Sequence, residues 1–408
     1  MTPGARLAAA GEILAEIIAR KAAADRTISA WGKAHRFAGS KDRAAIGERV
    51  FAVLRRYNEC AFALGSDAPR ALVLGSLKIQ DGLDVERIGV LCTDGSHALG
   101  ALSASEREVL NSVPVPDQPW IALNYPEWLH GALVSAFGDG LEREMEVLCQ
   151  RAPLDLRVNT LKAKRADVIL ELQALGLHPA PCRQAATGIR LSAGSDVKIT
   201  QLACYLEGRV EVQDERSQIA VQFAAAREGD MVIDLAAGGG GKALALAAWM
   251  QNKGQIIACD VSHERLQRMM PRIERAGATI IDIAGDPYSE SVKHRVGDGA
   301  DLVFIDAPCS GSGTWRRNPE SKWTLDAVRL DGYRSAQTQL LERAAALTGP
   351  RGRIVYAVCS VLPAEGPVQI ESFCRRFPSW RTGMVRTLTP ARSDTDGFFV
   401  AELKQGEA

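Results

Sequence analysis

Two cysteines occupy corresponding places in this sequence, each directly after a short apolar run. Cys309 lies in Asp306-Ala-Pro-Cys-Ser-Gly-Ser-Gly-Thr314, and Cys359 lies in Tyr356-Ala-Val-Cys-Ser-Val-Leu-Pro-Ala-Glu365. A lone cysteine is most often a buried structural residue, but the glycines and serines around Cys309 predict a tight, accessible loop. If both apolar runs are strands of one parallel sheet, their carboxyl ends converge at one edge. Two thiols and the Asp306 carboxylate would then meet, which suits nucleophilic catalysis with an acid partner.

A glycine-rich segment, Asp234-Leu-Ala-Ala-Gly-Gly-Gly-Gly-Lys242, lies between a predicted strand and a predicted helix. Glycines at such a place allow a tight turn and a close approach of the backbone to a ligand, although a purely structural turn has the same composition. Lys242 is followed by alanine instead of serine or threonine, which disfavours a phosphate-binding P-loop. We therefore expect this loop to bind a nucleoside cofactor through Ala236, Ala237, Gly238, Gly239, Gly240, Gly241 and Lys242.

Two further acidic residues extend this interpretation. Asp260 ends the next predicted strand, 26 residues after Asp234, where a carboxylate accepts the ribose hydroxyls of a nucleoside. A helix cap is the alternative role, because a helix is predicted to begin at Ser262. Asp286 follows a third apolar run and is expected to hold an adenine amino group. Together these features outline an adenosine pocket, which a nicotinamide dinucleotide would also fit.

The elements that must position these residues alternate along the chain. Strand-like runs at 231–235, 255–259, 301–306, 352–358 and 397–403, with a helix at 243–250, predict a mostly parallel sheet covered on both faces. The predicted fold class is α/β, with this Rossmann-like domain over residues 216–408. Short strands at 154–158, 189–191 and 210–212 and a helix at 165–175 predict a small α/β subdomain over 136–215. Residues 1–135 show helical patterning, with helices expected at 44–64 and 102–110.

The composition narrows the choice of partners. The 49 Lys and Arg residues balance the 49 Asp and Glu residues, so nucleic-acid binding would depend on a local basic groove. Nine scattered cysteines without a Cys-x-x-Cys pair, and only six histidines, predict no zinc or other metal site. The odd cysteine count and the lack of a secretory leader favour a reducing, cytoplasmic setting. No apolar run approaches the roughly 18 residues of a membrane span.

On the two cysteine motifs and the glycine loop, the chain resembles the RsmB/Sun/Nop-type RNA cytosine-5 methyltransferases over about residues 150–403. Further matching segments are Arg157-Val-Asn-Thr-Leu161, Gln213-Asp-Glu-Arg-Ser-Gln218 and Asp396-Gly-Phe-Phe399. The resemblance implies S-adenosylmethionine as cofactor, Cys359 as the nucleophile that attacks cytosine and Cys309 as the residue that helps release the product. We also expect Asp306 to lie between cofactor and base and to hydrogen-bond the base, and Lys242 to position Cys359 or lower its pKa.

The sequence departs from the family pattern in the cofactor loop. Where the family usually has Cys-Ala-Ala-Pro-Gly-Gly-Lys, this chain has Ala236-Ala-Gly-Gly-Gly-Gly-Lys242. Loss of the proline is expected to loosen the loop and to weaken cofactor affinity. In addition, Val358 replaces the threonine that usually precedes the nucleophile, and Gly366 stands where an asparagine is common.

RNA is the expected macromolecular partner. The target base must leave its stack to enter such a pocket, which favours a loop or a single strand. The segments Trp315-Arg-Arg317 and Lys322-Trp323, with Arg329, interleave aromatic and cationic side chains and are interpreted as contacts to bases and phosphates. An ordinary solvated loop explains each of these residues equally well.

The helical N-terminal region weakly resembles the NusB-like RNA-binding domain of bacterial ribosomal RNA members, which favours ribosomal RNA over transfer RNA. We expect a monomer that does not associate with membranes. The alternatives are a transfer RNA methyltransferase, an NAD-dependent dehydrogenase and a non-catalytic RNA-binding or assembly factor. A dehydrogenase leaves both cysteine motifs unexplained, and retention of both cysteines, Asp306 and Lys242 argues against a decayed enzyme.

Overall fold

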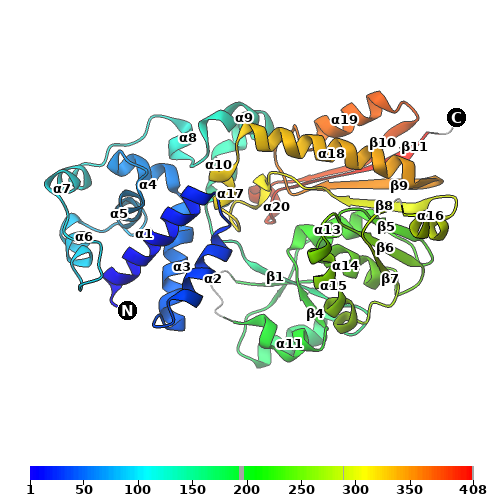
Figure 1. Ribbon diagram of the computed structural model, residues 1–408, viewed down its shortest axis with the longest axis horizontal. Helices are drawn as coiled ribbons and strands as arrows, with labels where there is room; N and C mark the ends of the chain where they lie inside the picture. The colour runs from blue at the N-terminus through cyan, green and yellow to red at the C-terminus, as the bar shows by residue number, and fades with distance from the viewer. Residues whose placement is uncertain (193–196, 288, 407–408) are drawn as a thin grey trace. The chain divides into compact units, whose positions relative to one another are not determined.

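The computed structural model describes residues 1–192, 197–287 and 289–406. The chain divides into two compact units (Figure 1). The first consists of Met1–Gln150 with Thr314–Asp326, and the second of Arg151–Gly313 with Ala327–Ala408. The finer division of the chain at residues 135 and 215 stays a prediction.

The first unit is helical, and its α-helices enclose one apolar core. Ile13 of α1, Val50 of α3 and Leu72 of α5 are among the residues buried there. The α-helices are α1 (Pro3–Arg20), α2 (Ala24–Ala34), α3 (Ser40–Arg55), α4 (Tyr57–Leu64), α5 (Pro69–Ile79), α6 (Val85–Cys92), α7 (Ala104–Asn111), α8 (Pro119–Ala122), α9 (His130–Phe137), α10 (Leu141–Leu148) and α17 (Glu320–Thr324). Among the described residues, no helix combines the length and the apolar character that crossing a bilayer requires.

Two helix predictions in this unit have different outcomes. The helix expected at 44–64 is wrong in its continuity, because Arg56 leaves the helical conformation with φ −123° and ψ 40°, so that α3 ends and α4 begins there. The helix expected at 102–110 is confirmed as α7. Its N-cap is Ser103, whose hydroxyl oxygen accepts a hydrogen bond from the Glu106 backbone N–H. The Glu106 carboxylate in turn accepts one from the Ser103 backbone N–H.

The second unit contains a small antiparallel sheet with strand order β2-β3-β1-β4. The predicted strands at 154–158, 189–191 and 210–212 are confirmed here, as is the helix that ends before Gly176. The elements are β1 (Leu154–Val158), α11 (Arg165–Ala174), β2 (Ala180–Pro181), β3 (Gly188–Leu191), α12 (Ala203–Leu206) and β4 (Val210–Val212).

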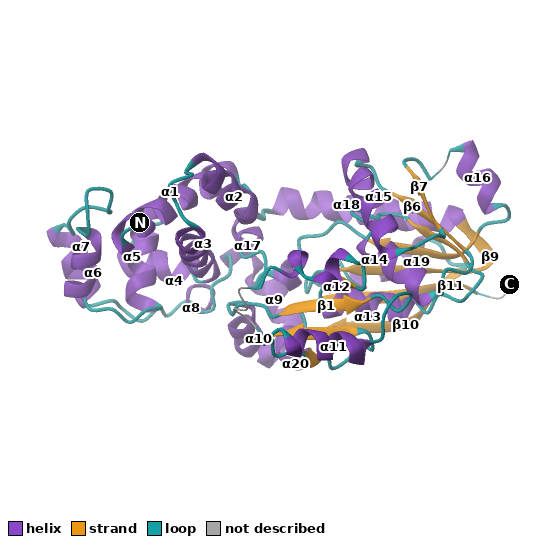
Figure 2. Ribbon diagram, turned by 90° about the horizontal axis from the view of Figure 1, so that it is seen from below, coloured by secondary structure: helices purple, strands orange, loops and turns teal. Residues whose placement is uncertain are grey.

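A seven-stranded sheet forms the rest of the second unit, with order β10-β11-β9-β8-β5-β6-β7 (Figure 2). Neighbouring strands from β9 to β7 are parallel, whereas β11 is antiparallel to both β9 and β10. Its elements are α13 (Glu215–Ala224), β5 (Met231–Asp234), α14 (Gly241–Trp249), β6 (Gln255–Cys259), α15 (His263–Ala276), β7 (Ile281–Ala284), α16 (Glu290–Val296), β8 (Ala300–Asp306), α18 (Ala327–Leu347), β9 (Thr348–Val358), α19 (Pro367–Arg376), β10 (Trp380–Leu388), α20 (Pro390–Ser393) and β11 (Phe398–Gln405).

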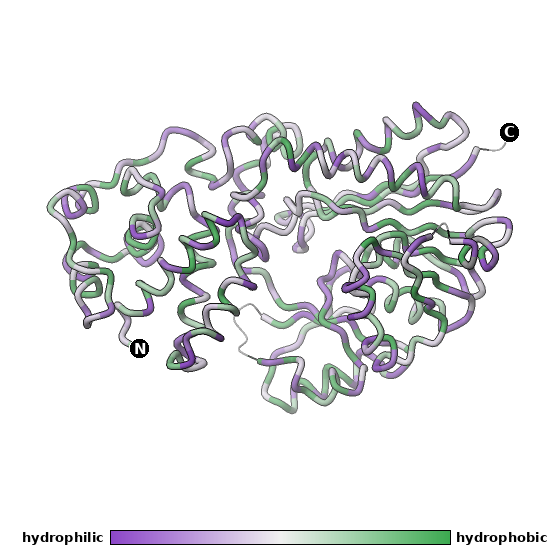
Figure 3. The backbone as a smooth tube through the Cα atoms, in the orientation of Figure 1, coloured by the Kyte–Doolittle hydropathy of each residue, from purple (hydrophilic) through white to green (hydrophobic). Residues whose placement is uncertain are grey.

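Both faces of this sheet are apolar, as expected for a parallel sheet covered by helices. Alternate residues of one strand enter different cores: Phe304 joins the cluster with α13 and α14, and Ile305 joins the cluster with α18 and α19. Figure 1 shows these helix pairs on opposite faces, and Figure 3 shows hydrophobic stretches along the strands. Chain order reverses on either side of β5, between β6 and β8, which is where such sheets leave a crevice at their carboxyl edge.

Candidate active site

A cavity of about 720 Å³ lies at the carboxyl edge of the larger sheet. It brings together residues from the ends of four neighbouring parallel strands: Asp234 at the end of β5, Asp260 after β6, Asp306 at the end of β8 and Cys359 after β9. Ala236, Ala237, Gly238, Gly239, Gly241, Lys242 and Cys309 also line it. The expected convergence of the loop, the acids and the two cysteines is therefore present in the fold.

Hydrogen bonds and close packing support the glycine loop, which lacks the proline usual in the family. Gly238 has φ +55°, and its N–H donates to Asp260 Oδ2 at 2.9 Å. Gly240 has φ +82°, and a β-carbon there would lie 2.3 Å from Met269 Cγ, so only glycine fits. The Gly239 carbonyl accepts from Arg272. These contacts support the loop at Gly238 and Gly239, and the looser loop and weaker cofactor affinity expected from the lost proline stay predictions.

The two acids expected to hold the nucleoside are placed differently. Asp260 lies in the cavity, only 8% exposed, and accepts from Gly238 N and, at 2.7 Å, from Ser262 N. It thus shapes the loop while still facing the cavity. Asp286 is an exposed residue after β7 and is not among the residues that line the cavity. The adenine contact expected of Asp286 therefore stays a prediction.

Asp234 is a cavity residue that the sequence reasoning passed over. It is fully buried, and neither carboxylate oxygen has a hydrogen-bond partner among the described residues. Burial, together with the charge of Asp306, raises its pKa to about 7. An orphaned buried carboxylate suits a cationic group, and the methionine ammonium of S-adenosylmethionine supplies one. With the glycine loop beside it, the cavity fits this cofactor. Within the described part of the chain, no group of three or more His, Cys, Asp or Glu side chains is arranged to bind a metal ion.

The two cysteines face each other at one side of the cavity. Their sulfur atoms are 3.2 Å apart, within hydrogen-bonding distance. The hydrogen bond with Cys359 raises the pKa of Cys309, and burial adds to this effect. The same hydrogen bond lowers the pKa of Cys359; burial opposes this effect, and the positive charge of Arg216 supports it. The two sulfur atoms thus share a proton, and the positive charge of Arg216 favours the thiolate on Cys359.

Lys242 pairs with Asp306 across the cavity floor. Burial opposes the charge of Lys242, but the Asp306 carboxylate raises its pKa above the ordinary value. The ammonium thus holds the Asp306 carboxylate in its orientation. The cation that acts on the Cys359 sulfur is Arg216, a residue not considered for this role from the sequence.

A second buried carboxylate, Glu365, joins the two cysteine loops. It is completely buried and accepts from Ser310 N at 2.8 Å, from the Ser310 hydroxyl, from Ser360 Oγ at 2.6 Å and from Gln337 Nε2 at 3.1 Å. Ser310 follows Cys309 and Ser360 follows Cys359 in the chain. Four donors on one carboxylate hold the sulfur atoms together, so these serines are buried anchors and not part of an open, accessible loop.

The interpretation of Trp315 and Lys322 as RNA contacts is wrong. Both are fully buried, and Lys322 Nζ donates to Arg55 O at 3.2 Å within the helical unit. Trp323 is partly buried and donates through its indole to Leu54 O at 2.6 Å. These side chains anchor the segment Thr314–Asp326 among helices. The aromatic and cationic residues therefore pack the interior of this unit; the polar ends of Lys322 and Trp323 find backbone acceptors there.

Comparison with known proteins agrees with this geometry. The model of the family described as 16S rRNA methyltransferase RsmB/F matches residues 221–404, and that of the ferredoxin-like domain of RsmF/B-like methyltransferases matches residues 125–198. A protein of Synechocystis named "Probable ribosomal RNA small subunit methyltransferase B" is 30% identical, covering 89% of this chain and 91% of that protein.

Two further proteins cover less of the chain. The ribosomal RNA small subunit methyltransferase B of Vibrio cholerae is 30% identical over 69% of this chain, which spans 65% of that relative's length. The crystal structure of a methyltransferase homolog protein from Pyrococcus horikoshii has a TM-score of 0.61 at 25% identity, covering 70% of this chain and 97% of that one. The expected fold class and S-adenosylmethionine cofactor are thereby confirmed. The chain belongs to the RsmB/F family of S-adenosylmethionine-dependent methyltransferases.

Proposed function

We propose that this protein methylates carbon 5 of a cytosine in ribosomal RNA through a covalent bond between Cys359 and the base. The observation that carries the proposal is the pair of sulfur atoms 3.2 Å apart at the edge of the cofactor cavity. Carbon 5 of cytosine is a poor nucleophile, and addition of a thiolate to carbon 6 makes it enamine-like and reactive. A thiolate and a thiol side by side meet the needs of an addition followed by an elimination.

The first half of the reaction uses Cys359 and Asp306. The Cys359 thiolate adds to carbon 6 of an unstacked cytosine, while Asp306, held by Lys242, hydrogen-bonds the base edge and supports protonation at ring nitrogen 3. The bound cofactor supplies an electrophilic methyl group, which carbon 5 takes up. Glu365 contributes by keeping the Cys309 and Cys359 loops next to each other.

The second half requires a base. Carbon 5 still carries its proton after methylation, and removal of that proton restores the double bond and expels the Cys359 sulfur. The thiolate of Cys359 is what chiefly raises the pKa of Cys309 in the free protein. Once Cys359 is bonded to carbon, this cause disappears, so Cys309 becomes more acidic and is available as a thiolate base. Cys309 is thus the release residue.

Ribosomal RNA is favoured as substrate by the relatives, whose names specify the small ribosomal subunit RNA. A transfer RNA substrate is the alternative within the same chemistry. A non-catalytic assembly factor is the alternative outside it. Binding of radiolabelled S-adenosylmethionine, followed by transfer of label to small-subunit ribosomal RNA or to transfer RNA, separates the three. The enzyme assignment fails if the cofactor does not bind.

Trapping of the covalent intermediate tests the roles of the cysteines. Cys309→Ala is expected to accumulate a protein–RNA adduct that survives denaturing electrophoresis, whereas Cys359→Ala forms none and loses methylation. Cys374→Ala is the matched control, because this partly buried cysteine lies outside the cavity. Full activity in Cys359→Ala would overturn the assignment, and bisulfite sequencing of the RNA product identifies the cytosine.

A further inference from the structure

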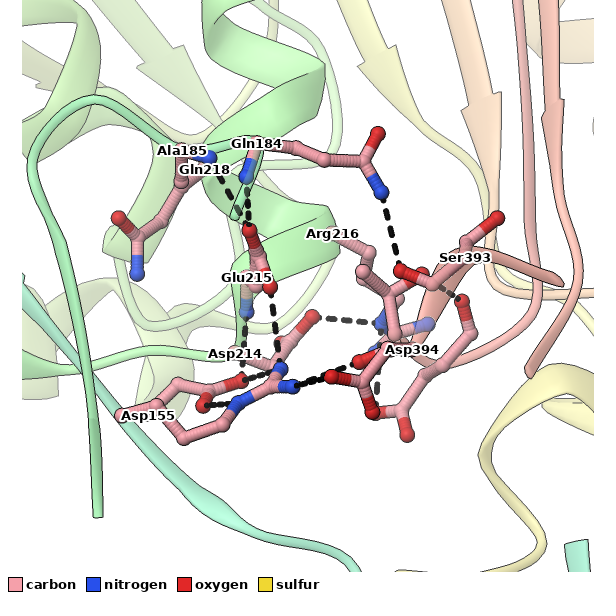
Figure 4. Close-up of polar contacts among 12 residues, drawn as sticks. Asp155, Gln184, Ala185, Asp214, Glu215, Arg216, Gln218, Ser393 and Asp394 are labelled. Carbon is pink, nitrogen blue, oxygen red and sulfur yellow. Dashed lines mark hydrogen bonds and ion pairs between the residues drawn. The ribbon is translucent and has the colours of Figure 1, made fainter. Parts of the chain in front are cut away.

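Arg216 is a partly buried cation to which the sequence motifs assign no role. It lies in the first turn of α13, next to Asp214, which caps this helix. Arg216 Nε donates to Asp214 Oδ1 at 2.7 Å, and Asp396 Oδ2 lies 3.8 Å from the same nitrogen. Only 12% of the Arg216 side chain is exposed, and Figure 4 shows it enclosed by polar partners. The guanidinium is therefore fixed in position.

Other carboxylates near Arg216 form ion pairs with a different arginine, Arg190. Arg190 pairs with Asp155 at 2.7 Å, with Glu215 at 3.0 Å and with Asp394 at 2.9 Å. Figure 4 labels these three carboxylates. These ion pairs tie the small sheet, α13 and the segment after α20 together without Arg216. Arg216 Nη1 is buried and has no hydrogen-bond partner among the described residues. The surrounding ion pairs and hydrogen bonds thus leave one nitrogen of the Arg216 guanidinium, Nη1, without a hydrogen bond among the described residues.

Backbone pairing brings Asp396, an ion-pair partner of Arg216, close to Cys359. In the β9–β11 ladder, Phe399 is opposite Val358, so the residues before Phe399 run alongside Cys359. Gly313 joins the two segments: its N–H donates to Cys359 O at 3.0 Å, and its carbonyl accepts from Gly397 N at 2.8 Å. Asp396 therefore directly precedes Gly397, which Gly313 links to Cys359 through two backbone hydrogen bonds. The guanidinium anchored on Asp396 is held near the sulfur.

The charges around Cys359 distinguish Arg216 from Lys242. The Cys309 thiol lies 3.2 Å from the sulfur, the positive charge of Arg216 lowers the pKa of Cys359, and the Asp306 carboxylate disfavours a thiolate. Lys242 is committed to Asp306. Among the groups that act on the Cys359 sulfur, Arg216 is the cation, and an arginine stays charged at every pH at which the protein folds.

We propose that Arg216 is a positioning residue that holds the Cys359 sulfur as a thiolate, oriented for attack, before RNA arrives. The inference rests on the proposed role of Cys359 as nucleophile. Because a cysteine reacts as its thiolate, a permanent cation beside it makes the reactive fraction high at neutral pH without a proton transfer to a general base. Asp214 and Asp396 act by aiming this cation.

The direct test is the pH dependence of alkylation of Cys359 by iodoacetamide, followed by mass spectrometry of the peptide that contains it. The full-length protein is used without RNA. In Arg216→Met the midpoint is expected to rise by about two pH units from a pKa of about 6, so that alkylation at pH 7 slows about tenfold. Arg216→Lys restores part of the difference, because it keeps a cation. An unchanged midpoint in a folded Arg216→Met protein overturns the proposal.

Two further variants keep the test decisive. If Arg216→Met does not fold because two carboxylates lose their cation, the double variant Arg216→Met/Asp396→Asn replaces it, and thermal melting monitors both. In Cys309→Ala the thiol hydrogen bond is absent, and the Cys359 midpoint is still expected below that of a free cysteine. A midpoint at the ordinary value of about 8.5 in this variant would refute a role for Arg216.

Methylation assays separate this inference from the proposed function. At saturating RNA and cofactor, Arg216→Met is expected to lower the rate at pH 7 and to regain rate as the pH rises toward 9, with little change in the KM for either substrate. If the unaltered protein makes no 5-methylcytosine, the proposed function fails, whatever the alkylation result. If it does, and Arg216→Met has the unaltered pH profile, only the role of Arg216 fails.

Discussion

The orphaned carboxylate of Asp234 predicts a substitution that stabilises the protein while it damages function. Asp234→Asn keeps the shape of the side chain and removes its charge. In the cofactor-free protein the carboxylate is buried without a hydrogen-bond partner among the described residues. Its ionisation therefore costs free energy, which the ammonium group of a bound cofactor would offset.

The direction and the size of the stability change in Asp234→Asn follow from the pKa of Asp234. The folded state raises the pKa of Asp234 from an ordinary 3.8 to about 7, through burial and the charge of Asp306. Between these values the folded protein holds a proton that the unfolded chain has lost, so the free energy of unfolding falls as the pH rises. Each tenfold change in proton affinity corresponds to about 1.36 kcal/mol. The advantage of the neutral asparagine should thus widen by about 2–3 kcal/mol between pH 5 and pH 8.

Urea denaturation of the cofactor-free protein at several pH values between 5 and 8.5 measures this difference. Titration calorimetry with S-adenosylmethionine measures the functional effect, which we expect to be a loss of about 10- to 100-fold in affinity, the usual range for a hydrogen bond to a charged group. Asp282→Asn is the matched control: this half-exposed carboxylate on β7 lies outside the cavity, so neither quantity should change by much.

Two results would refute this reasoning. If the difference in free energy of unfolding between the two proteins were the same at pH 5 and pH 8, Asp234 would not be a buried, strained carboxylate. If the affinity for S-adenosylmethionine were unchanged, the carboxylate would have no part in holding the cofactor.

Four further substitutions test other contacts. Glu365→Gln should slow single-turnover methylation about 100-fold and lower the free energy of unfolding by about 2 kcal/mol, because the charge shared by four donors is lost; an unchanged rate would contradict the joining of the cysteine loops. Arg272→Met should weaken cofactor binding about 5-fold in calorimetry by freeing the Gly239 carbonyl, with kcat unaltered; unaltered affinity would mean that the loop needs no such support. Gly240→Ala should abolish cofactor binding and lower the melting temperature, since a β-carbon finds no space there. Trp323→Phe should destabilise the helical unit by about 1 kcal/mol through loss of the indole hydrogen bond, while cofactor affinity, measured in parallel, stays the same.

The sequence alone was enough to predict which edge of the sheet carries the cavity. Apolar runs that end in an acid or a cysteine must be buried strands, and parallel strands end at the same edge, so Asp306, Cys309, Cys359 and the glycine loop had to converge. This inference needed only hydrophobic periodicity and local chain geometry. The helix at 102–110 and the short strands of the small sheet were predictable for the same reason, because each depends on residues close together in the chain.

The tertiary structure alone decided which residues surround the reactive atoms. Arg216 and Cys359 are more than 100 residues apart in the chain, and they meet because the β9–β11 ladder brings Asp396 next to Cys359. Trp315 and Lys322 have the composition of an RNA-binding loop, yet they are buried among helices. Electrostatic effects and burial depend on distances through space, and those distances arise only when segments far apart in the sequence pack together.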